Sequence, residues 1–175
     1  MKPSSKLNLL KTKRDIEGAI RRLADQINSD YTDSTPLLIG VLKGTFIFMA
    51  DLVRELTIDL EIDFIELCSY EDGTESSKNV KTIKGLNTNI KNRDIIIVED
   101  IVDTGLTMDS LITQLEENNP SSIKVCALTS KPSRRVVDIS IDYLGFEVEN
   151  VFLVGYGLDF NQKYRNFPEL YYLEI

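Results

Sequence analysis

The residues with the clearest capacity for chemistry lie between Ile95 and Thr107, where the sequence reads IIIVEDIVDTGLT. The apolar start of this segment predicts a buried strand that ends at two adjacent carboxylates, Glu99 and Asp100. A polar turn containing Gly105 follows, and a helix is expected to begin directly after it. Free backbone amides and the helix dipole make such a helix start a binding site for an anion. Carboxylates beside that anion suit a ligand with hydroxyl groups or a bound Mg²⁺, and a sugar phosphate meets both conditions.

The composition limits the chemistry that this segment can perform. The sequence contains no histidine, which excludes Ser-His-Asp and Cys-His catalysis and every His-ligated metal site. With 20 Lys and Arg against 28 Asp and Glu, the formal net charge is −8. This charge argues against a generic nucleic-acid binder and against a protein of anionic membranes. Any catalysis must therefore use carboxylates, lysine, backbone amides or a hard metal ion.

The acidic segment also has a simpler interpretation. A lone Asp-Thr-Gly, as at 103–105, is more often an ordinary helix cap with solvated acids. The complete order of strand, two acids, turn and helix favours the anion site. Two commoner phosphate motifs do not fit this sequence. The run GVLKGT after Ile39 has its lysine before the second glycine, unlike a Walker A loop, and Gly155-Tyr156-Gly157 lacks the third glycine of a dinucleotide-binding loop.

Apolar periodicity predicts that buried strands alternate with helices along the chain. Buried strands are expected at 37–41, 95–98, 123–128 and 151–154. Helices are expected at about 14–28, 46–53 and 106–118. This alternation is typical of an α/β fold in which helices flank a parallel, twisted sheet.

A parallel sheet binds its ligands at the carboxyl edge of its strands, so the polar residues that follow the strands define the expected site. These polar clusters are 42–45, the residues from 99 onward, 130–131 and 155–159. If the four strands are parallel, all four clusters face one crevice. No linker or repeat divides the sequence, and we expect a single domain over 1–175.

Three further segments have patterns of their own. Strict alternation at 58–64 predicts a half-solvated strand, and the polar residues 71–79 predict a mobile loop before a returning strand at 80–83. Thr12 and Asp15 have the spacing of a capping box at the start of the first helix.

Cys68 and Cys126 lie in apolar, strand-like runs without a CxxC motif, and we interpret them as buried, unreactive thiols. The basic start of the chain has too few apolar residues for a signal peptide. The longest apolar stretch, 37–50, is interrupted by Lys43 and is too short to span a membrane. The sequence therefore predicts a cytoplasmic protein in a reducing compartment.

Residues 98–107, VEDIVDTGLT, resemble the phosphoribosyl pyrophosphate (PRPP) signature of type I phosphoribosyltransferases, and more narrowly of their 6-oxopurine branch. Further landmarks of the family follow the same order: Leu42-Lys43-Gly44, Ser69-Tyr70, Ser130-Lys131-Pro132, and 152–159 with Arg165. The resemblance runs from about residue 37 to the end of the sequence. It implies a hood formed by the N-terminal segment and about 155–175, and a mobile two-stranded loop at about 69–82.

The resemblance also implies an activity, which is transfer of the phosphoribosyl group of PRPP to hypoxanthine or guanine in purine salvage. The products would be IMP or GMP and pyrophosphate. Asp103 would act as general base toward the imidazole nitrogen of the purine. The ribose and phosphate of PRPP would contact Glu99, Asp100, Asp103, Thr104, Gly105, Leu106 and Thr107. The pyrophosphate would contact Lys43, Gly44 and Arg165. The purine would contact Lys131, Phe152, Leu153 and Asp159.

Mg²⁺ is the cofactor that the resemblance implies, held directly or through water by Glu99 and Asp100, with Asp159 reaching a second Mg²⁺ directly or through water. Ser69 and Tyr70 would open the mobile loop, which closes over the reacting centre and excludes water. The peptide bond between Leu42 and Lys43 is implied to be cis in at least some states. The implied partners are PRPP and the purine base, without nucleic acid or membrane, in a homodimer or homotetramer. The preference among hypoxanthine, guanine and xanthine stays open.

Two other classes of protein compete with this interpretation. A phosphotransfer receiver domain also has an acidic pair at a strand end and a lysine-proline after a later strand, as at Lys131-Pro132. Its acidic pair lies near the N-terminus, whereas here the pair lies at 99–100. A nucleotide-sensing RNA regulator with the same fold would need a basic face, and the net charge of −8 argues against one.

Overall fold

The computed structural model describes residues 6–69 and 80–174. The strands are β1 (Lys6–Lys11), β2 (Leu37–Leu42), β3 (Glu61–Ser69), β4 (Val80–Lys84), β5 (Asp94–Val102), β6 (Ser122–Ser130), β7 (Tyr143–Glu147), β8 (Phe152–Val154) and β9 (Leu170–Glu174). The helices are α1 (Lys13–Asp30), α2 (Phe46–Glu55) and α3 (Leu106–Glu116), with a 3₁₀ turn at Pro132–Arg134.

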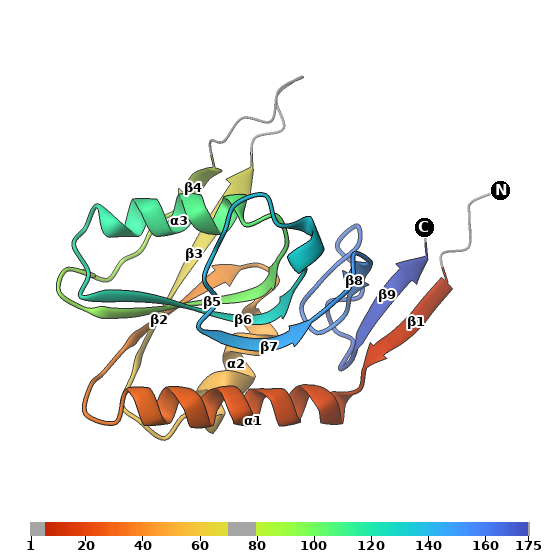
Figure 1. Ribbon diagram of the computed structural model, residues 1–175, viewed down its shortest axis with the longest axis horizontal. Coiled ribbons are helices and arrows are strands. Elements are labelled where there is room, and N and C mark those ends of the chain that lie inside the picture. The colour runs from red at the N-terminus through yellow and green to blue at the C-terminus, as the bar shows by residue number, and fades with distance from the viewer. Residues whose placement is uncertain (1–5, 70–79, 175) are drawn as a thin grey trace.

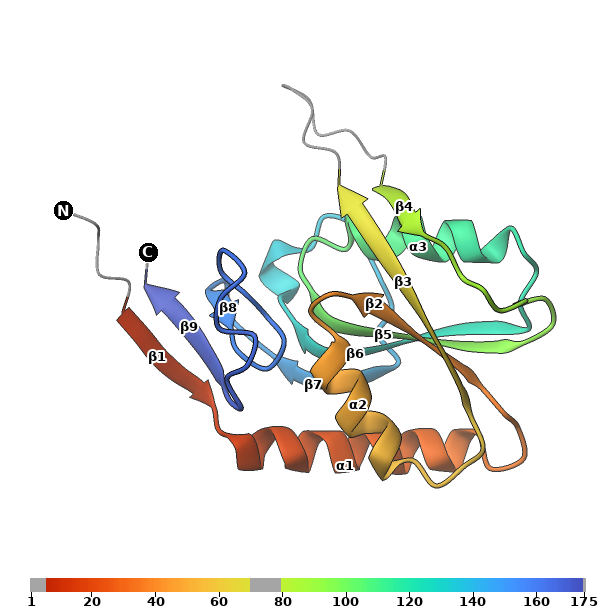
Figure 2. The ribbon, with the colours of Figure 1, turned by 180° about the vertical axis from the view of Figure 1, so that it is seen from behind.

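The main sheet has the strand order β4-β3-β2-β5-β6-β7. The five strands from β3 to β7 in this order run parallel, and β4 pairs antiparallel with β3 at the edge. Figure 1 shows α1 and α2 beneath the sheet and α3 above it, and the view from behind in Figure 2 shows the same layers. The structure confirms the predicted fold class, a parallel sheet with helices on both faces.

The central strand β5 explains why its sequence is a continuous apolar run. Ile95 and Ile97 belong to the core beneath α3, whereas Ile96 and Val98 belong to the core under α1 and α2. Successive side chains of a strand point to opposite faces, so a strand covered on both faces needs apolar residues at every position. All four side chains are fully buried.

The start of α1 agrees with its predicted cap. Thr12 Oγ1 accepts a hydrogen bond from the backbone amide of Asp15 at 3.2 Å, and the Asp15 carboxylate accepts one from the backbone amide of Thr12 at 2.9 Å. These reciprocal bonds satisfy two of the amides that a helix start leaves unpaired. The capping box at 12–15 is therefore confirmed.

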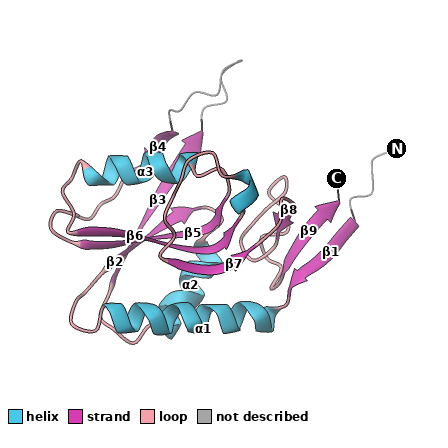
Figure 3. Cartoon of the chain, viewed as in Figure 1, coloured by secondary structure: helices cyan, strands magenta, loops and turns pink. Residues whose placement is uncertain are grey.

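A second, smaller sheet corrects one prediction about the last buried strand. Residues 151–154 were expected to form a parallel strand of the main sheet, but β8 lies in a three-stranded antiparallel sheet of order β1-β9-β8. This sheet is at one end of the molecule in Figure 3, where the first and last strands lie side by side. The last parallel strand of the main sheet is β7, which the apolar pattern does not predict.

Two boundaries also differ from the sequence interpretation. β5 does not end at Glu99 and Asp100 but continues to Val102, because β6 extends far enough to pair with it there. β3 begins at Glu61, three residues after the start of the predicted alternation. β4 confirms the returning strand, and the predicted loop at 71–79 lies outside the described residues.

Cys126 is fully buried, which confirms the predicted burial of this residue, and burial raises the pKa of its thiol. The Cys68 side chain lies outside what the structure describes. No helix within 6–69 and 80–174 is long and apolar enough to cross a membrane.

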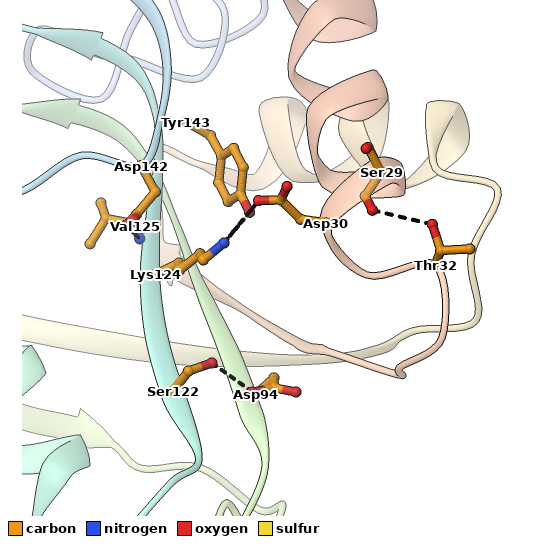
Figure 4. Close-up of polar contacts among 9 residues, drawn as sticks. All are labelled: Ser29, Asp30, Thr32, Asp94, Ser122, Lys124, Val125, Asp142 and Tyr143. Atoms are coloured by element: carbon orange, nitrogen blue, oxygen red, sulfur yellow. Dashed lines mark hydrogen bonds and ion pairs between the residues drawn. The ribbon is translucent and has the colours of Figure 1, made fainter.

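A polar cluster lies at the amino edge of the main sheet, away from the carboxyl ends of the strands (Figure 4). Lys124 Nζ of β6 donates to Asp30 Oδ2 at 2.8 Å and to the Tyr143 hydroxyl oxygen at 3.0 Å. The Tyr143 hydroxyl also donates to Asp30 Oδ2 at 2.6 Å. Because Asp30 is the last residue of α1, these bonds attach the end of that helix to β6 and β7.

Candidate active site

The carboxyl ends of β2, β5 and β6 and the start of β8 surround a cavity of about 610 Å³. The predicted site residues that line it are Lys43, Gly44, Glu99, Asp100, Asp103, Thr107, Lys131, Phe152, Leu153, Asp159 and Arg165. The polar cluster after β8 thus reaches the predicted crevice, although β8 belongs to the small sheet.

A smaller cavity of about 130 Å³ lies at the start of α3. It is lined by Thr104 and Gly105 together with Glu99, Asp103 and Thr107, which come from the end of β5 and the turn after it. Gly105 has φ +87°, and a Cβ at this position would lie 2.8 Å from the carbonyl oxygen of Val137. Only glycine fits this position without strain.

The first turn of α3 has the amides that an anion needs. The first intrahelical hydrogen bond runs from the Asp109 amide to the Gly105 carbonyl oxygen at 2.9 Å, so the amides of 106–108 precede it. The Leu106 amide has only a long contact of 3.4 Å to Thr104 Oγ1. Leu106 lines neither cavity, and its contribution is limited to this amide. The turn and the helix start can bind a phosphate group.

The two adjacent acids have little contact with solvent. Asp100 is 6% exposed, and the buried Glu99 Oε2 has no hydrogen-bond partner among the described residues. Burial raises the pKa of both carboxyl groups, and for Glu99 repulsion from Asp100 adds to this effect. Two buried carboxylates this close favour a bound cation.

The acidic pair fits Mg²⁺ in one particular way. Mg²⁺ commonly takes one or two protein carboxylates and completes its shell with water and substrate phosphates. The orphaned oxygen of Glu99 and the neighbouring Asp100 supply such a pair. Within the described part of the chain, no group of three or more candidate ligands is found. Asp159 lines the same cavity but pairs with Arg165 at 2.7 Å instead of joining the two acids.

Asp103 lies between two cations. Its Oδ2 is 3.4 Å from Lys131 Nζ, and its Oδ1 accepts a hydrogen bond from Arg134 Nε at 3.1 Å. The Lys131 side chain is 8% exposed, whereas the Arg134 side chain is about half exposed. The sequence interpretation includes Asp103 and Lys131 but misses Arg134. The signal available was Pro132, which starts the 3₁₀ turn that brings residue 134 back toward the site.

The turn after β2 carries the expected cis peptide bond between Leu42 and Lys43. The Lys43 side chain is exposed and lies 3.8 Å from Glu66. Gly44 lies against Asp100, because a Cβ on Gly44 would be 1.6 Å from Asp100 Oδ2. The bare backbone of this turn therefore lies beside the acidic pair.

The small sheet supplies the aromatic part of the cavity. Phe152, 41% exposed, packs edge-on against Phe160 with the ring centroids 5.4 Å apart, and the Leu153 side chain is buried. An exposed ring face in a cavity can stack on a planar base. Ser69 is the last residue of β3, and Tyr70 lies outside the described residues.

The fold and the cavity together define a class of enzymes, the phosphoribosyltransferases. The model of the phosphoribosyl transferase domain matches residues 8–161, and the chain belongs to this family. It is 45% identical over 160 residues to the hypoxanthine-guanine phosphoribosyltransferase of Bacillus subtilis (strain 168). This match covers 91% of this chain and 89% of that protein.

Solved structures of the same kind of enzyme have the same fold. A hypoxanthine-guanine phosphoribosyltransferase from Bacillus anthracis, with a HEPES molecule in its active site, matches with a TM-score of 0.91 and 39% identity. That match covers 94% of this chain and 97% of the other. A hypoxanthine phosphoribosyltransferase from Staphylococcus aureus matches with a TM-score of 0.92 and 38% identity, over 95% of this chain and 91% of the other.

Proposed function

We propose that this phosphoribosyltransferase transfers the phosphoribosyl group of PRPP to hypoxanthine or guanine and releases pyrophosphate. The observation that carries the proposal is the convergence of three chemically different parts on one cavity. These parts are the phosphate-binding turn before α3, the buried pair Glu99 and Asp100, and Lys131 with the ring of Phe152. A substrate with a phosphate, ribose hydroxyls and a planar base matches all three.

The ribose phosphate would occupy the turn at 104–107, where backbone amides and threonine hydroxyls donate to its oxygens. The acidic pair would accept hydrogen bonds from the ribose hydroxyls. As positive charge develops on the ribose ring in the transition state, the nearby carboxylates stabilise it. Mg²⁺, when bound, would neutralise the departing pyrophosphate. Glu99 and Asp100 would hold it, with a contribution of Asp159 through water remaining a prediction.

The pyrophosphate would lie beside the turn at Lys43 and Gly44. The backbone amides of this turn and the Lys43 ammonium are the groups available to an anion there. Arg165 is the other cation of this region, and its guanidinium currently bonds to Asp159 and to the Gly157 carbonyl oxygen. A pyrophosphate contact from Arg165 requires it to share or exchange one of these partners.

The purine would stack on Phe152 and present its 6-oxo oxygen to Lys131. Lys131 Nζ now contacts Asp103, so binding of a 6-oxopurine would transfer that ammonium to the base. This exchange frees Asp103 Oδ2 to accept the proton of the imidazole nitrogen as the new glycosidic bond forms. Adenine has an amino group at the same position and gives Lys131 no acceptor, so the site favours 6-oxopurines.

A direct assay tests the proposal. Purified protein is incubated with PRPP, Mg²⁺ and hypoxanthine, guanine, xanthine or adenine, and nucleotide formation is followed by chromatography. We expect IMP or GMP with stoichiometric pyrophosphate and little or no AMP. Absence of nucleotide from every base would overturn the proposal. Salt-dependent RNA binding without conversion of a purine base to a nucleotide would instead support the RNA regulator. Labelling of an aspartate by acetyl phosphate would support the receiver domain.

The remaining properties stay predictions, from the sequence or from the resemblance to the family. These are a single domain over 1–175, a cytoplasmic location, a homodimer or homotetramer, and closure of the loop that Ser69 and Tyr70 open. The order of preference among hypoxanthine, guanine and xanthine is also a matter for the assay.

A further inference from the structure

The Gly-Tyr-Gly turn, defined here as residues 155–158, lies against the turn that carries Lys43 and Gly44. Gly157 has φ +98°, and a Cβ placed on it would lie 1.9 Å from the carbonyl oxygen of Gly44. Real side-chain atoms do not approach a carbonyl oxygen this closely. The two glycines therefore bring two backbone segments into direct contact, although they lie 113 positions apart in the sequence, at 44 and 157.

Gly157 is held in this position from its own side. Its amide donates to the Arg165 carbonyl oxygen at 2.9 Å, and its carbonyl oxygen accepts a hydrogen bond from Arg165 Nη1 at 2.8 Å. The hydroxyl of the neighbouring Tyr156 donates to Asp51 of α2. The Gly-Tyr-Gly turn thus has little freedom to move away from Gly44 without losing these bonds.

Gly44 has a second close neighbour, the Asp100 carboxylate of the acidic pair. A Cβ on Gly44 would lie 1.6 Å from Asp100 Oδ2, so its backbone is in contact with that buried carboxylate. The Gly44 peptide is therefore fixed between Asp100 and Gly157. Neither neighbour is a flexible side chain, because one is buried and the other is backbone.

We propose that Gly157 is a positioning residue for the pyrophosphate half of the active site. It supports the Gly44 peptide from behind and so sets the distance between the amides of the Lys43-Gly44 turn and the acidic pair. Gly157 is not among the residues that line the cavity, so it acts through Gly44. This inference rests on the proposed function, and it adds a residue whose effect is confined to one half of the substrate.

The substitution Gly157→Ala tests this role because it adds one methyl group at the contact. The methyl carbon must separate from the Gly44 oxygen by more than 1 Å, from 1.9 Å to at least 3.0 Å. Displacements of about 1 Å in a catalytic site can change rates by roughly 100-fold. We expect KM for PRPP to rise at least about ten-fold and the Kd of magnesium pyrophosphate to rise in parallel. KM for the purine should stay within about two-fold, since the Lys131 and Phe152 contacts are not displaced.

Gly155→Ala is the matched control. Gly155 is in the same turn, has φ +94°, and its Cβ would lie 2.2 Å from the carbonyl oxygen of Glu169. Both variants therefore carry the strain of an alanine at positive φ and a clash with a backbone carbonyl. They differ in direction, because the Gly155 clash is with the segment before β9 and not with the active site. We expect Gly155→Ala to lower Tm while KM for PRPP rises much less than in Gly157→Ala, by no more than about two- to three-fold.

The measurements are steady-state kinetics and calorimetric titration of magnesium pyrophosphate, at a temperature where circular dichroism shows both variants folded. If Gly157→Ala does not fold, Tyr156→Phe replaces it, since loss of the bond to Asp51 loosens the same turn without adding volume. That variant should raise KM for PRPP about two- to three-fold with an unchanged KM for the purine.

Equal pyrophosphate affinity in Gly157→Ala and Gly155→Ala would overturn the positioning role. So would a Gly157→Ala enzyme in which the KM values of both substrates rise together, or an unaltered KM for PRPP in Tyr156→Phe. These outcomes leave the proposed function intact, provided that the wild-type protein forms nucleotide. If the wild type forms none, the proposed function fails, and the pyrophosphate titration still decides whether Gly157 shapes that site.

Discussion

Asp103 has a cation on each of its two oxygens, Lys131 on Oδ2 and Arg134 on Oδ1. The pair with Arg134 is partly exposed and of modest strength, whereas Lys131 is buried. A base that must accept a proton needs one oxygen to be free. In the proposed exchange, Lys131 moves from Asp103 to the 6-oxo oxygen of the purine and leaves Asp103 Oδ2 free. Recognition of the correct purine is thereby coupled to activation of Asp103 as the general base.

Asp103→Asn tests the base directly. The amide keeps the shape of the side chain but cannot accept the proton, so kcat should fall by about 100-fold or more while KM for PRPP changes little. The exposed Asp109→Asn on the first turn of α3 is the control, because it makes the same change in charge outside the cavity. Steady-state kinetics of both variants decide the matter, and a wild-type kcat in Asp103→Asn would remove the base from the mechanism.

Lys131→Met tests the purine contact. Loss of a hydrogen bond from a charged donor is worth about 1.5–3 kcal/mol, which corresponds to a roughly 10- to 150-fold rise in KM for guanine or hypoxanthine. KM for PRPP should change far less, because the turn at 104–107 that would bind the ribose phosphate (the phosphate turn) does not include Lys131. Initial rates at varied base and varied PRPP separate the two values. A rise shared equally by both substrates would indicate a general disturbance of the cavity and contradict the assigned contact.

At the scale of elements, the end of α1 depends on a charge that comes from another strand. Asp30 is an acid at the C-terminus of a helix, where the helix dipole disfavours it, and the last turn contains no basic residue. Lys124 of β6 compensates by bonding to the carboxylate, and Tyr143 adds a second donor. These two hydrogen bonds hold the pKa of Asp30 below its usual value, and the bond from Lys124 has the larger effect.

Asp30→Asn should therefore destabilise the protein in a pH-dependent way. A lowered pKa in the folded state means that the stabilisation is present above the unfolded pKa of about 3.9 and is lost as pH falls through the folded value. Because the Asp30 side chain is 45% exposed, solvent screening limits the effect to below about 1 kcal/mol, or about 1–4 °C in Tm at pH 7. Thermal denaturation from pH 7 to pH 3 should show the difference from wild type shrinking below pH 4. The exposed Asp33→Asn serves as control, and a constant difference over that range would contradict the prediction.

The sequence predicts the elements that pack against segments close to them in the chain, and the strands that are covered on both faces of the sheet. The apolar run at 95–98 and the helix after Gly105 belong to strand-helix units, and the structure has both. β7 escapes prediction because its sequence, YLGFE, is short and contains a glycine, and its identity as a strand comes from pairing with β6. β8 is assigned to the wrong sheet because its partner, β9, lies at the other end of a 15-residue connection, 155–169.

The same distinction applies to the site. Residues at strand ends and in the turn before α3 follow from the α/β pattern, and the acids at 99–100 are found in this way. The contact of Arg134 with Asp103 and the contact of Gly157 with Gly44 depend on how separate segments pack. No local pattern encodes such packing, so the sequence identifies which residues form the site but not how they restrain one another.

At the scale of the whole molecule, the acidic total does not oppose an anionic substrate. Fields from distant charges are screened beyond about 8–10 Å at physiological ionic strength. The main cavity is lined by four cationic side chains, those of Lys43, Lys131, Arg134 and Arg165. The turn at 104–107 lines the smaller cavity at the start of α3, where its backbone amides are available to an anion. The charge balance inside the cavity therefore decides whether an anion binds, and the net charge of the whole protein does not.

The cavity lies between two sheets, and this arrangement predicts how ligands stabilise the fold. The phosphate turn follows β5 of the main sheet, whereas Phe152 and Leu153 belong to β8 of the small sheet. In the proposed binding mode a nucleoside monophosphate would contact both sheets at once, whereas ribose 5-phosphate or a free base would contact one. Because the two parts of a nucleotide share a single loss of translational and rotational freedom, the nucleotide should bind much more tightly than its parts.

Thermal denaturation with each ligand measures this effect. At about 100 times its Kd, GMP or IMP should add about 2.7 kcal/mol of stability and raise Tm by roughly 5–11 °C. Hypoxanthine and ribose 5-phosphate together, each at the same concentration as the nucleotide, should give a clearly smaller shift. AMP, which offers Lys131 no acceptor at position 6, is the control for the purine end and should also give a smaller shift. Equal shifts from IMP and from the mixture of its parts would mean that the nucleotide does not span the two sheets, and that the cavity holds the phosphate and the base in some other arrangement.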